Sequence, residues 1–123
     1  LNAGIMALPT RELTPQGFEK QFGVNHVAHQ HLTQLLLPKV TATPGARVVV
    51  LASTAHAFGD VDVNDLDFDG GRSYTPWGAY GQSKLANILF ARALARRLAP
   101  TGQLAVSVHP GVIKTGLWKQ SFG

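Results

Sequence analysis

The sequence contains no cysteine, and this absence excludes disulfide bridges and thiolate metal sites. No apolar run approaches the length of a membrane span, and no basic segment followed by an apolar one opens the chain. Nothing in the composition therefore points to an oxidising compartment, and we expect a cytoplasmic protein. The sequence leaves open whether a membrane anchor lies upstream of Leu1.

Charged residues are few, at 15%, while hydrophobic residues make up 45% of the 123 positions. That composition is ordinary for a folded protein, and the length suits one domain rather than two. The net charge is +4, from 11 Lys and Arg against 7 Asp and Glu. The basic residues are scattered, apart from Arg92, Arg96 and Arg97 on the solvated side of a predicted helix. Because nucleic-acid binders concentrate basic residues on one face, this distribution argues against that class.

Two predicted helices alternate with short strand segments. The first helix is predicted from Thr14-Pro15 to about residue 40, and the second from Thr75-Pro76 to about residue 98, each with a capping residue followed by proline. Residues 47–52 and 104–108 predict buried strands, and residues 1–4 resemble the end of another strand. Such alternation implies a parallel sheet whose right-handed crossovers put both helices on one face. No predicted helix covers the other face of the sheet, so we expect that half of the domain is missing from this sequence.

The strongest chemical signal is the pair Tyr80 and Lys84, four residues apart on the second predicted helix. This spacing puts the phenol and the ammonium on one helix face. A nearby positive charge favours the phenolate, so we expect Lys84 to lower the pKa of Tyr80 from its usual value of about 10. The pair is a candidate for acid/base catalysis. From the spacing alone, an ordinary surface pair is the alternative.

Further candidate residues lie where strands end. Ser53 follows the buried strand directly, Pro110-Gly111 follows the last strand, and Asn2-Ala3-Gly4 follows the strand stub. Open parallel sheets bind ligands outside the carboxyl ends of their strands. These segments could therefore converge on one edge of the sheet.

Asn25 is a candidate on the first predicted helix. It shares a helical stripe with Phe18, Phe22 and His29. A buried amide needs hydrogen-bond partners, so Asn25 is either a functional residue or a packing residue that distorts the helix.

In this order, the segments resemble the motifs of the short-chain dehydrogenase/reductase family. The resemblance covers essentially the whole chain and is specific, because five motifs occur in sequence. They are Asn2-Ala3-Gly4, the helical Asn25, Ala52-Ser53-Thr54-Ala55-His56, Tyr80-Gly81-Gln82-Ser83-Lys84 and Pro110-Gly111-Val112-Ile113-Lys114-Thr115. The serine motif and Ser83-Lys84-Leu85-Ala86-Asn87 are most similar to the retinol dehydrogenase-like branch, which includes the WW-domain-containing oxidoreductase.

The resemblance implies an α/β fold, namely the C-terminal half of a Rossmann-type doubly wound parallel sheet, and NADP or NAD as cofactor. Tyr80 would exchange a proton with the oxygen of an alcohol or carbonyl, and Ser53 would hold that oxygen. Lys84 would lower the pKa of Tyr80 and bind the nicotinamide ribose, and Asn25 would keep a water in the relay to Lys84. The residues implied to line the cofactor are Asn2, Ala3, Gly4, Tyr80, Lys84, Pro110, Gly111, Ile113 and Thr115.

The sequence departs from the family in its phosphate-binding part. No glycine-rich loop follows a strand, and Gly70-Gly71 lies in an acidic loop instead. We therefore expect residues 1–123 to form a single partial catalytic domain, with NADP favoured over NAD by resemblance and an apolar alcohol or carbonyl as substrate. The alternative is a non-catalytic fragment or interaction module that associates through its two helices. Those helices build the family's dimer interface, so we expect a homodimer if the full domain is present.

Other chemistries fit the residues less well. Metal binding by His26, His29 and His31 would require the helix to unwind, because His31 points away from the other two. A serine hydrolase built on Ser53 lacks both glycines of the nucleophile elbow.

Trp77 and Trp118 flank the proposed pocket in the sequence. We interpret both as packing residues, with contact to an apolar substrate as the alternative.

Overall fold

In the computed structural model, the described part of the chain comprises residues 1–113, 116, 117 and 119. Two parallel strands, β1 (Arg47–Leu51) and β2 (Leu104–Val108), pair in register from Arg47 opposite Leu104. The first residue continues the sheet on the free edge of β1. Its backbone donates to Val49 O at 2.8 Å and accepts from Leu51 N at 3.2 Å. The predicted strands and the parallel α/β sheet are confirmed, and the N-terminal stub lies beside β1 as its hydrogen bonds require.

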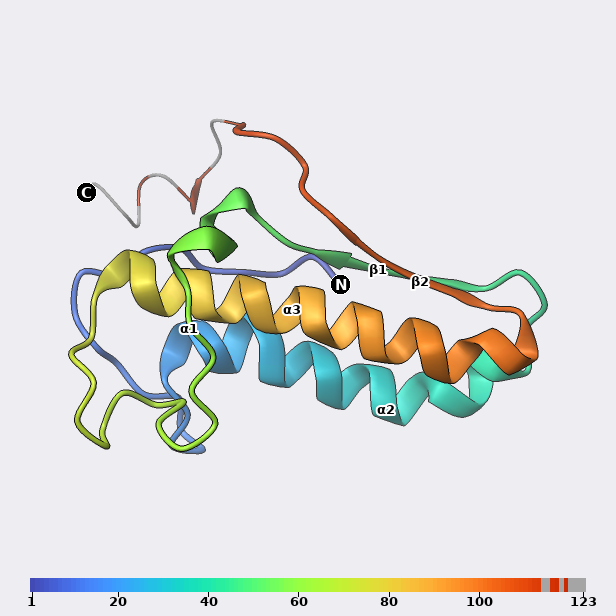
Figure 1. Cartoon of the computed structure of the whole chain (residues 1–123), viewed down its shortest axis with the longest axis horizontal. Helices are drawn as coiled ribbons and strands as arrows, with labels where there is room; N and C mark the ends of the chain where they lie inside the picture. Colours follow the sequence, from blue (N-terminus) through green and yellow to red (C-terminus); the bar gives the residue numbers. More distant parts are fainter. Residues whose placement is uncertain (114–115, 118, 120–123) are drawn as a thin grey trace.

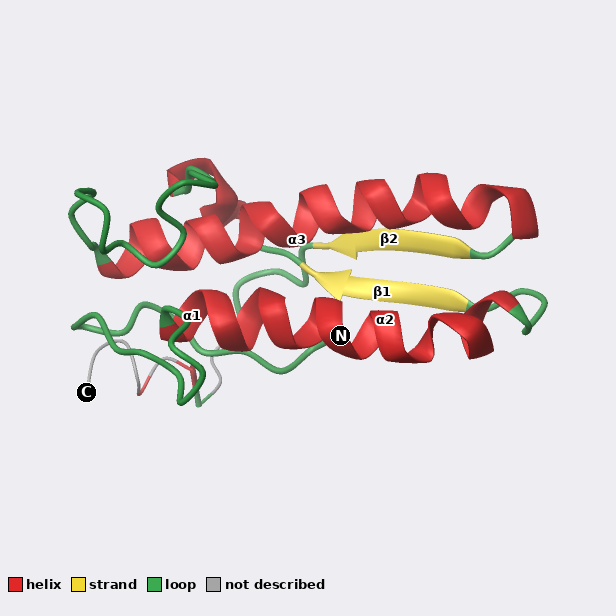
Figure 2. Ribbon diagram, turned by 90° about the horizontal axis from the view of Figure 1, so that it is seen from below, coloured by secondary structure: helices red, strands yellow, loops and turns green. Residues whose placement is uncertain are grey.

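Both long helices lie on the same side of the strands, side by side beneath them (Figure 1). The first helical region consists of α1 (Lys20–Phe22), the π-helical segment η1 (Gly23–Val27) and α2 (Ala28–Thr41), and the second helix is α3 (Pro76–Leu98). Figure 2 shows the same arrangement from below, with β1 and β2 seen between α2 and α3. The helices run opposite to the strands, as helices that connect parallel strands do. This confirms the predicted one-sided cover.

The bounds of α3 agree with the prediction from the sequence. Thr75 caps the helix by accepting from Gly78 N at 3.0 Å, and Pro76 occupies the first helical position. A short 3-10 turn, η3 (Ala99–Thr101), ends it, and Gly102 follows with φ 82°, a left-handed conformation that glycine adopts without strain.

The predicted start of the first helix is wrong by five residues. Thr14 accepts from Phe18 N at 3.2 Å within a turn, and an antiparallel bridge joins Leu13 to Glu19. The N-cap is Glu19, whose buried carboxylate accepts from Gln21 N at 2.9 Å and Phe22 N at 2.7 Å. A capping carboxylate satisfies two free helical amides, so it defines the helix start in place of the Thr-Pro pair. As a consequence Phe18 lies outside the helix and is exposed.

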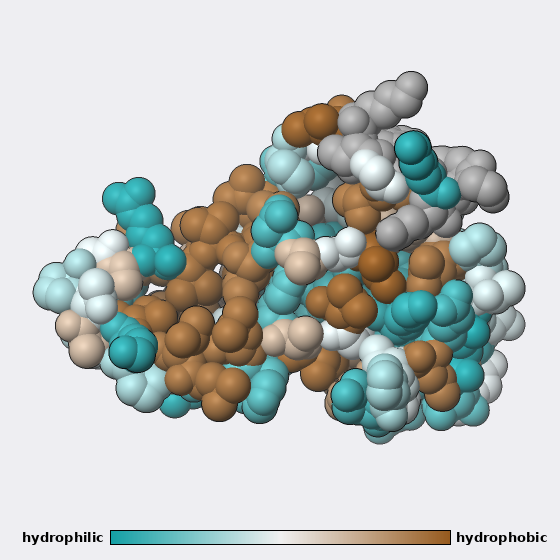
Figure 3. Space-filling model, turned by 180° about the vertical axis from the view of Figure 1, so that it is seen from behind, coloured by the Kyte–Doolittle hydropathy of each residue, from teal (hydrophilic) through white to brown (hydrophobic). Residues whose placement is uncertain are grey.

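The hydrophobic core lies between the strands and α3. Val48 and Val50 point inward and contact Ala91, Leu94 and Leu98. The sequence predicted strands buried on both faces, but the burial alternates along β1 instead. The outward-facing residues are Val49, Leu104, Val106 and Val108, all of them exposed. Seen from behind, hydrophobic side chains gather over the half of the molecule that holds α2 and the strands (Figure 3).

The segment predicted as a polar loop after Ser53 contains one helical turn, η2 (Thr54–Phe58), and then an ordered acidic loop. In that loop the carboxylate of Asp65 accepts from the backbone amides of Asp69, Gly70 and Arg72 at 2.7–3.0 Å. These bonds hold the pKa of Asp65 below its usual value. No helix within the described part of the chain is long and apolar enough to cross a membrane.

Candidate active site

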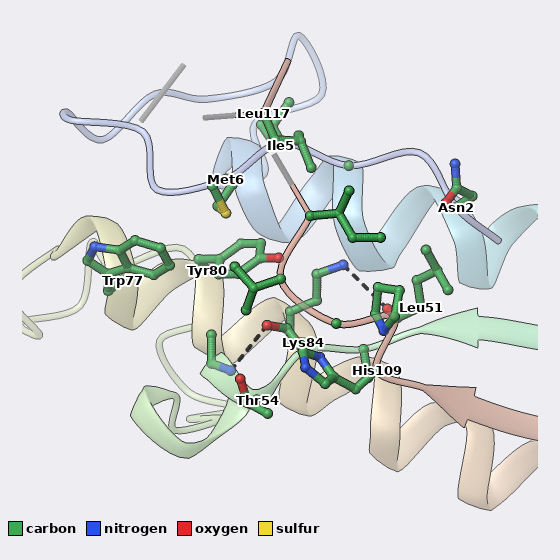
Figure 4. Close-up of a pocket in the computed structure, with 18 of the residues that line it drawn as sticks. Asn2, Ile5, Met6, Leu51, Thr54, Trp77, Tyr80, Lys84, His109 and Leu117 are labelled. Carbon is green, nitrogen blue, oxygen red and sulfur yellow. Dashed lines mark hydrogen bonds between the residues drawn. The ribbon is translucent and has the colours of Figure 1, made fainter. Parts of the chain in front are cut away.

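The carboxyl ends of the strands open into a cavity of about 800 Å³. Figure 4 shows Tyr80, Lys84 and Trp77 reaching toward it from α3, with Asn2, Ile5 and Met6 on the N-terminal segment. The predicted site residues that line the cavity are Asn2, Ala3, Gly4, Ser53, Tyr80, Lys84, Pro110, Gly111 and Ile113. Segments that are far apart in the sequence therefore meet at one edge of the sheet, as predicted. The predicted Thr115, like Trp118, lies outside the described residues.

Tyr80 and Ser53 form the polar centre of the cavity wall. Ser53 follows Ala52 at the end of β1, caps η2 by accepting from Ala55 N at 3.1 Å, and lies close enough to the Tyr80 phenol to influence its pKa. Burial raises the pKa of Tyr80 above its usual value, while Ser53 acts in the opposite direction. The phenol is therefore protonated at neutral pH and can donate a proton to an oxygen in the cavity.

Lys84 lies one turn after Tyr80, and its Nζ is 5.5 Å from the centre of the Tyr80 ring. The ammonium donates to Leu51 O at 3.3 Å, a hydrogen bond drawn in Figure 4. Burial lowers the pKa of Lys84. The expected lowering of the Tyr80 pKa by Lys84 is wrong for this structure, because burial of the phenol dominates and Lys84 is directed to a backbone carbonyl.

Asn25 lies beneath the cavity and does not line it. Its Oδ1 accepts from Ile5 N at 2.9 Å, and its Nδ2 donates to Ile5 O at 2.9 Å and to Ser83 Oγ at 2.9 Å. The two bonds to Ile5 clamp the segment that forms one wall of the cavity. Asn25 also lies in the π-helical segment η1, and such segments are frequent at functional sites.

The N-terminal segment is held by a second buried amide, at a residue that no sequence motif indicates. Gln21 Oε1 accepts from Ala7 N at 2.7 Å, and its Nε2 donates to Tyr74 Oη at 2.9 Å and Pro76 O at 3.1 Å. Ala7 is buried with φ 49°, a conformation that is uncommon for a residue other than glycine. Gln21 thereby fixes the backbone next to Met6, which lines the cavity.

One side of the cavity is apolar. Met6, Phe58, Trp77 and Leu117 line it, together with Val112. The Trp77 ring lies 5.8 Å from the Tyr80 ring, at an interplanar angle of 81°. Trp77 thus packs on Tyr80 and lines the cavity at once. Trp77 and Tyr80 are three residues apart on α3, a spacing that puts them on one helix face and could have indicated this contact from the sequence.

The residues at one end of the cavity fit a nicotinamide and its ribose. Asn2, Ala3 and Gly4 of the N-terminal segment, Pro110, Gly111 and Ile113 of the segment after β2, and Lys84 of α3 all line this cavity. Gly4 packs so closely on Asn25 that a Cβ there would lie 3.2 Å from Asn25 Oδ1. Among the described residues Gly70 donates to Asp65, so this glycine pair does not form a cradle for a pyrophosphate.

Comparison with known proteins gives a consistent picture. Residues 1–122 match the protein family described as enoyl-(acyl carrier protein) reductase. The chain is 47% identical over 121 residues to retinol dehydrogenase 12 of Mus musculus. This match covers 98% of this chain but 37% of that protein. It thus spans little more than a third of the length of the curated relatives it matches.

Two solved structures are similar over 98% of this chain. An uncharacterised protein from Mycobacterium paratuberculosis is 47% identical with a TM-score of 0.82, and the match covers 43% of that chain. A short-chain dehydrogenase from Shigella flexneri complexed with NADP is 26% identical with a TM-score of 0.70, and the match covers 45% of that chain.

Proposed function

The chain belongs to the short-chain dehydrogenase/reductase family, and we propose that it forms the proton-transfer part of an NAD(P)-dependent oxidoreductase that interconverts an alcohol and a carbonyl. One observation carries the proposal: Tyr80, Ser53 and Lys84 line a single cavity at the carboxyl ends of the strands. On this reading residues 1–123 are a single partial catalytic domain. Similar chains in complex with NADP and NADPH support the nicotinamide cofactor, with NADP favoured.

Tyr80 is the proposed acid and base. In reduction its phenol gives a proton to the carbonyl oxygen, and in oxidation the phenolate removes the proton of the hydroxyl. Because burial raises the pKa of Tyr80 above its usual value, the phenol carries its proton at neutral pH and is available as the acid. Ser53, close to the same phenol, is placed to hold the substrate oxygen beside it.

Lys84, the N-terminal segment and the segment after β2 are proposed to hold the cofactor. When bound, the nicotinamide gives or accepts a hydride, and the protein positions it. Asn2, Ala3, Gly4, Pro110, Gly111 and Ile113 would enclose the ring. The resemblance adds Thr115, which lies outside the described residues. Lys84 would bind the ribose hydroxyls through its ammonium, and Asn25 would support the relay from below through Ile5 and Ser83.

The apolar wall supports an apolar substrate. Met6, Phe58 and Trp77 lie on the side of the cavity that adjoins Tyr80. A retinol dehydrogenase is among the relatives, and its name states an alcohol as substrate. We infer that the substrate of this chain is a small apolar alcohol or carbonyl whose oxygen reaches Ser53 and Tyr80.

A second candidate function is association without catalysis. Leu32, Leu35 and Leu36 are exposed on α2, so this helix offers an apolar stripe to a second copy of the chain. A homodimer through α2 and α3 would bury it. In this case cofactor would not bind, and the cavity would have no chemical role.

The decisive measurement is turnover of an apolar aldehyde by the wild type and by Tyr80→Phe, followed through the absorbance of NADPH. Loss of the phenol should lower kcat by about 10²–10⁴-fold, the usual contribution of a general acid. Tyr74→Phe is the matched control, because Tyr74 is a partly buried tyrosine that donates to Leu8 O outside the cavity.

Full activity of Tyr80→Phe would reject the catalytic assignment. If neither NADPH nor NADH raises the melting temperature of a chain extended to include the phosphate-binding half, the association function is favoured instead.

A further inference from the structure

Asn87 is a fully buried amide at the point where three elements meet. It lies on α3, three residues after Lys84, with an exposed fraction of 0%. Its Nδ2 donates to Asn25 O in η1 at 3.0 Å and to Leu51 O in β1 at 3.1 Å. Its Oδ1 is 3.0 Å from His26 Nδ1. Every polar group of the side chain is used, so Asn87 ties α3 to η1 and to the end of β1.

The hydrogen bonds also fix which way the amide points. Only the NH₂ group can donate to the two carbonyls, so Oδ1 faces His26 and His26 Nδ1 must carry a proton. The imidazole is itself held between two rings, 5.1 Å from Phe22 and 5.9 Å from Phe90. His26 therefore keeps Asn87 in the orientation that presents both N–H groups to the carbonyls.

The carbonyl of Leu51 has a second donor, the ammonium of Lys84 at 3.3 Å. This bond is longer than the usual N–H···O distance of about 2.7–3.2 Å, whereas the bond from Asn87 falls within that range. The carbonyl is therefore shared between two donors, of which Asn87 has the shorter bond.

We propose that Asn87 is a positioning residue of the active site, which shares the Leu51 carbonyl with Lys84 and thereby controls how strongly that carbonyl holds the ammonium at the base of the cavity. The proposal rests on the proposed function for the catalytic role of Lys84. Its geometry, however, involves neither cofactor nor substrate, so it is testable on the chain itself.

Replacing the amide has an effect of defined sign on Lys84. In Asn87→Ala, Leu51 O loses its competing donor and becomes a better acceptor for the ammonium. The space left by the amide is lined by carbonyl groups and admits water, which reduces the burial penalty on the charge. Both changes favour the charged form, so the pKa of Lys84 should rise by about half a unit to one unit, the equivalent of one hydrogen bond.

The test is an NMR titration of the lysine side-chain Cε resonances in the 123-residue chain, with the Lys84 signal assigned through Lys84→Met. The matched control is Thr33→Val, which removes another buried hydrogen bond, from Thr33 Oγ1 to His29 O at 2.8 Å, without touching Lys84 or Leu51. We expect a rise of the Lys84 pKa in Asn87→Ala and an unchanged value in Thr33→Val. An unchanged Lys84 pKa in folded Asn87→Ala overturns the proposal.

A second variant covers the case in which Asn87→Ala does not fold. His26→Phe keeps the ring packing between Phe22 and Phe90 but removes the donor to Asn87 Oδ1. The Lys84 pKa should then shift upward by a smaller amount, and no shift would count against the positioning role. Because the titration contains no cofactor, its outcome is independent of whether Tyr80→Phe abolishes turnover.

Discussion

At the scale of single residues, Ser53 lowers the pKa of the nearby Tyr80 phenol. This effect opposes the larger effect of burial, which raises that pKa. We predict that Ser53→Ala raises the pKa of Tyr80 further, measured by NMR titration of the tyrosine Cζ resonances at alkaline pH. Thr54→Ala, a change at the next residue of the cavity lining, should leave that pKa unchanged. A lower Tyr80 pKa in Ser53→Ala would contradict the assignment.

The buried histidines give the stability a pH dependence. Burial lowers the pKa of His26, and burial with the nearby charges of the N-terminal amine and Lys84 lowers the pKa of His29. A lowered pKa in the folded state means that the unfolded chain takes up protons first as the pH falls. This contribution to stability is therefore complete above about pH 6.5 and is lost as the pH falls through the folded-state pKa values.

We predict that the free energy of unfolding, measured with urea, decreases between about pH 7.5 and about pH 5.5. The decrease should be smaller in His26→Phe, which cannot be protonated at this position. His31 is exposed, so His31→Gln should retain the wild-type dependence. Identical slopes for His26→Phe and the wild type would show that His26 does not contribute.

The motif residues were predictable one by one, while the residues that hold them were not. Tyr80, Lys84 and Ser53 follow from spacing and from their places at strand ends, and all three line the cavity. Asn87 and Gln21 are ordinary polar residues in the sequence. Their burial depends on partners such as Asn25, 62 residues away, and Tyr74, 53 residues away. Such contacts arise only when the elements have been assembled.

At the scale of elements, Gly81 in α3 and Gly59 directly after η2 let these two helices approach closely enough to bring Ser53 to Tyr80. A Cβ on Gly81 would lie 2.6 Å from Ala55 O and 2.7 Å from Gly59 N, which are backbone atoms that cannot rotate away. Alanine is favoured over glycine in a helix by about 1 kcal/mol, but overpacking costs about 1–3 kcal/mol. The steric cost of the added Cβ therefore decides whether Gly81→Ala destabilises the fold.

We predict that Gly81→Ala lowers the free energy of unfolding by up to about 2 kcal/mol, the difference of those two terms, and reduces turnover by displacing Ser53. Urea unfolding and the NADPH assay measure the two effects. Gly116→Ala is the control, because a Cβ there meets nothing within 4 Å. A Gly81→Ala chain as stable as the wild type would mean that η2 and α3 can separate without cost.

The helices differ in how well the sequence predicts their starts, for a physical reason. At α3 the Thr75 cap and Pro76 act together and no competing cap lies nearby. Before α1 the same Thr-Pro pattern is followed by Glu19, whose N–H is bonded to Asp67 Oδ1 at 2.7 Å from the distant acidic loop. This long-range bond places Glu19 at the cap, and burial raises its pKa. The sequence shows both caps but not which one is supported by another segment.

At the scale of the whole molecule, the outer face of the two strands remains apolar and open. Val49 and Val106 are paired neighbours on this face, and 41% and 45% of their surfaces are exposed. Alternation of helices and strands was sufficient to predict this one-sided cover. The family resemblance was needed to identify the sheet as part of a Rossmann-type fold. A pair of parallel strands by itself does not distinguish between α/β folds.

Such a face promotes self-association, and charge on it should oppose association. We predict that Val49→Lys and Val106→Lys lower the average mass in sedimentation equilibrium toward the 13.1 kDa of one chain. Val63→Lys introduces the same charge on an exposed loop valine away from the sheet and should have no such effect. If all three variants sediment alike, association occurs elsewhere, and the leucine stripe of α2 is the next surface to test.

The parallel pairing of β1 with β2 has a kinetic consequence. Arg47 meets Leu104 only after all of α3 has been bridged, and Leu1 meets Val49 across 48 residues. Closing loops of this length costs chain entropy before any strand contact repays it, and chains dominated by such contacts fold slowly. The two helices can form early from local contacts, whereas the strand ends come together late. The cavity at those ends, and with it the meeting of Ser53 with Tyr80, should therefore be among the last parts of the molecule to appear during refolding.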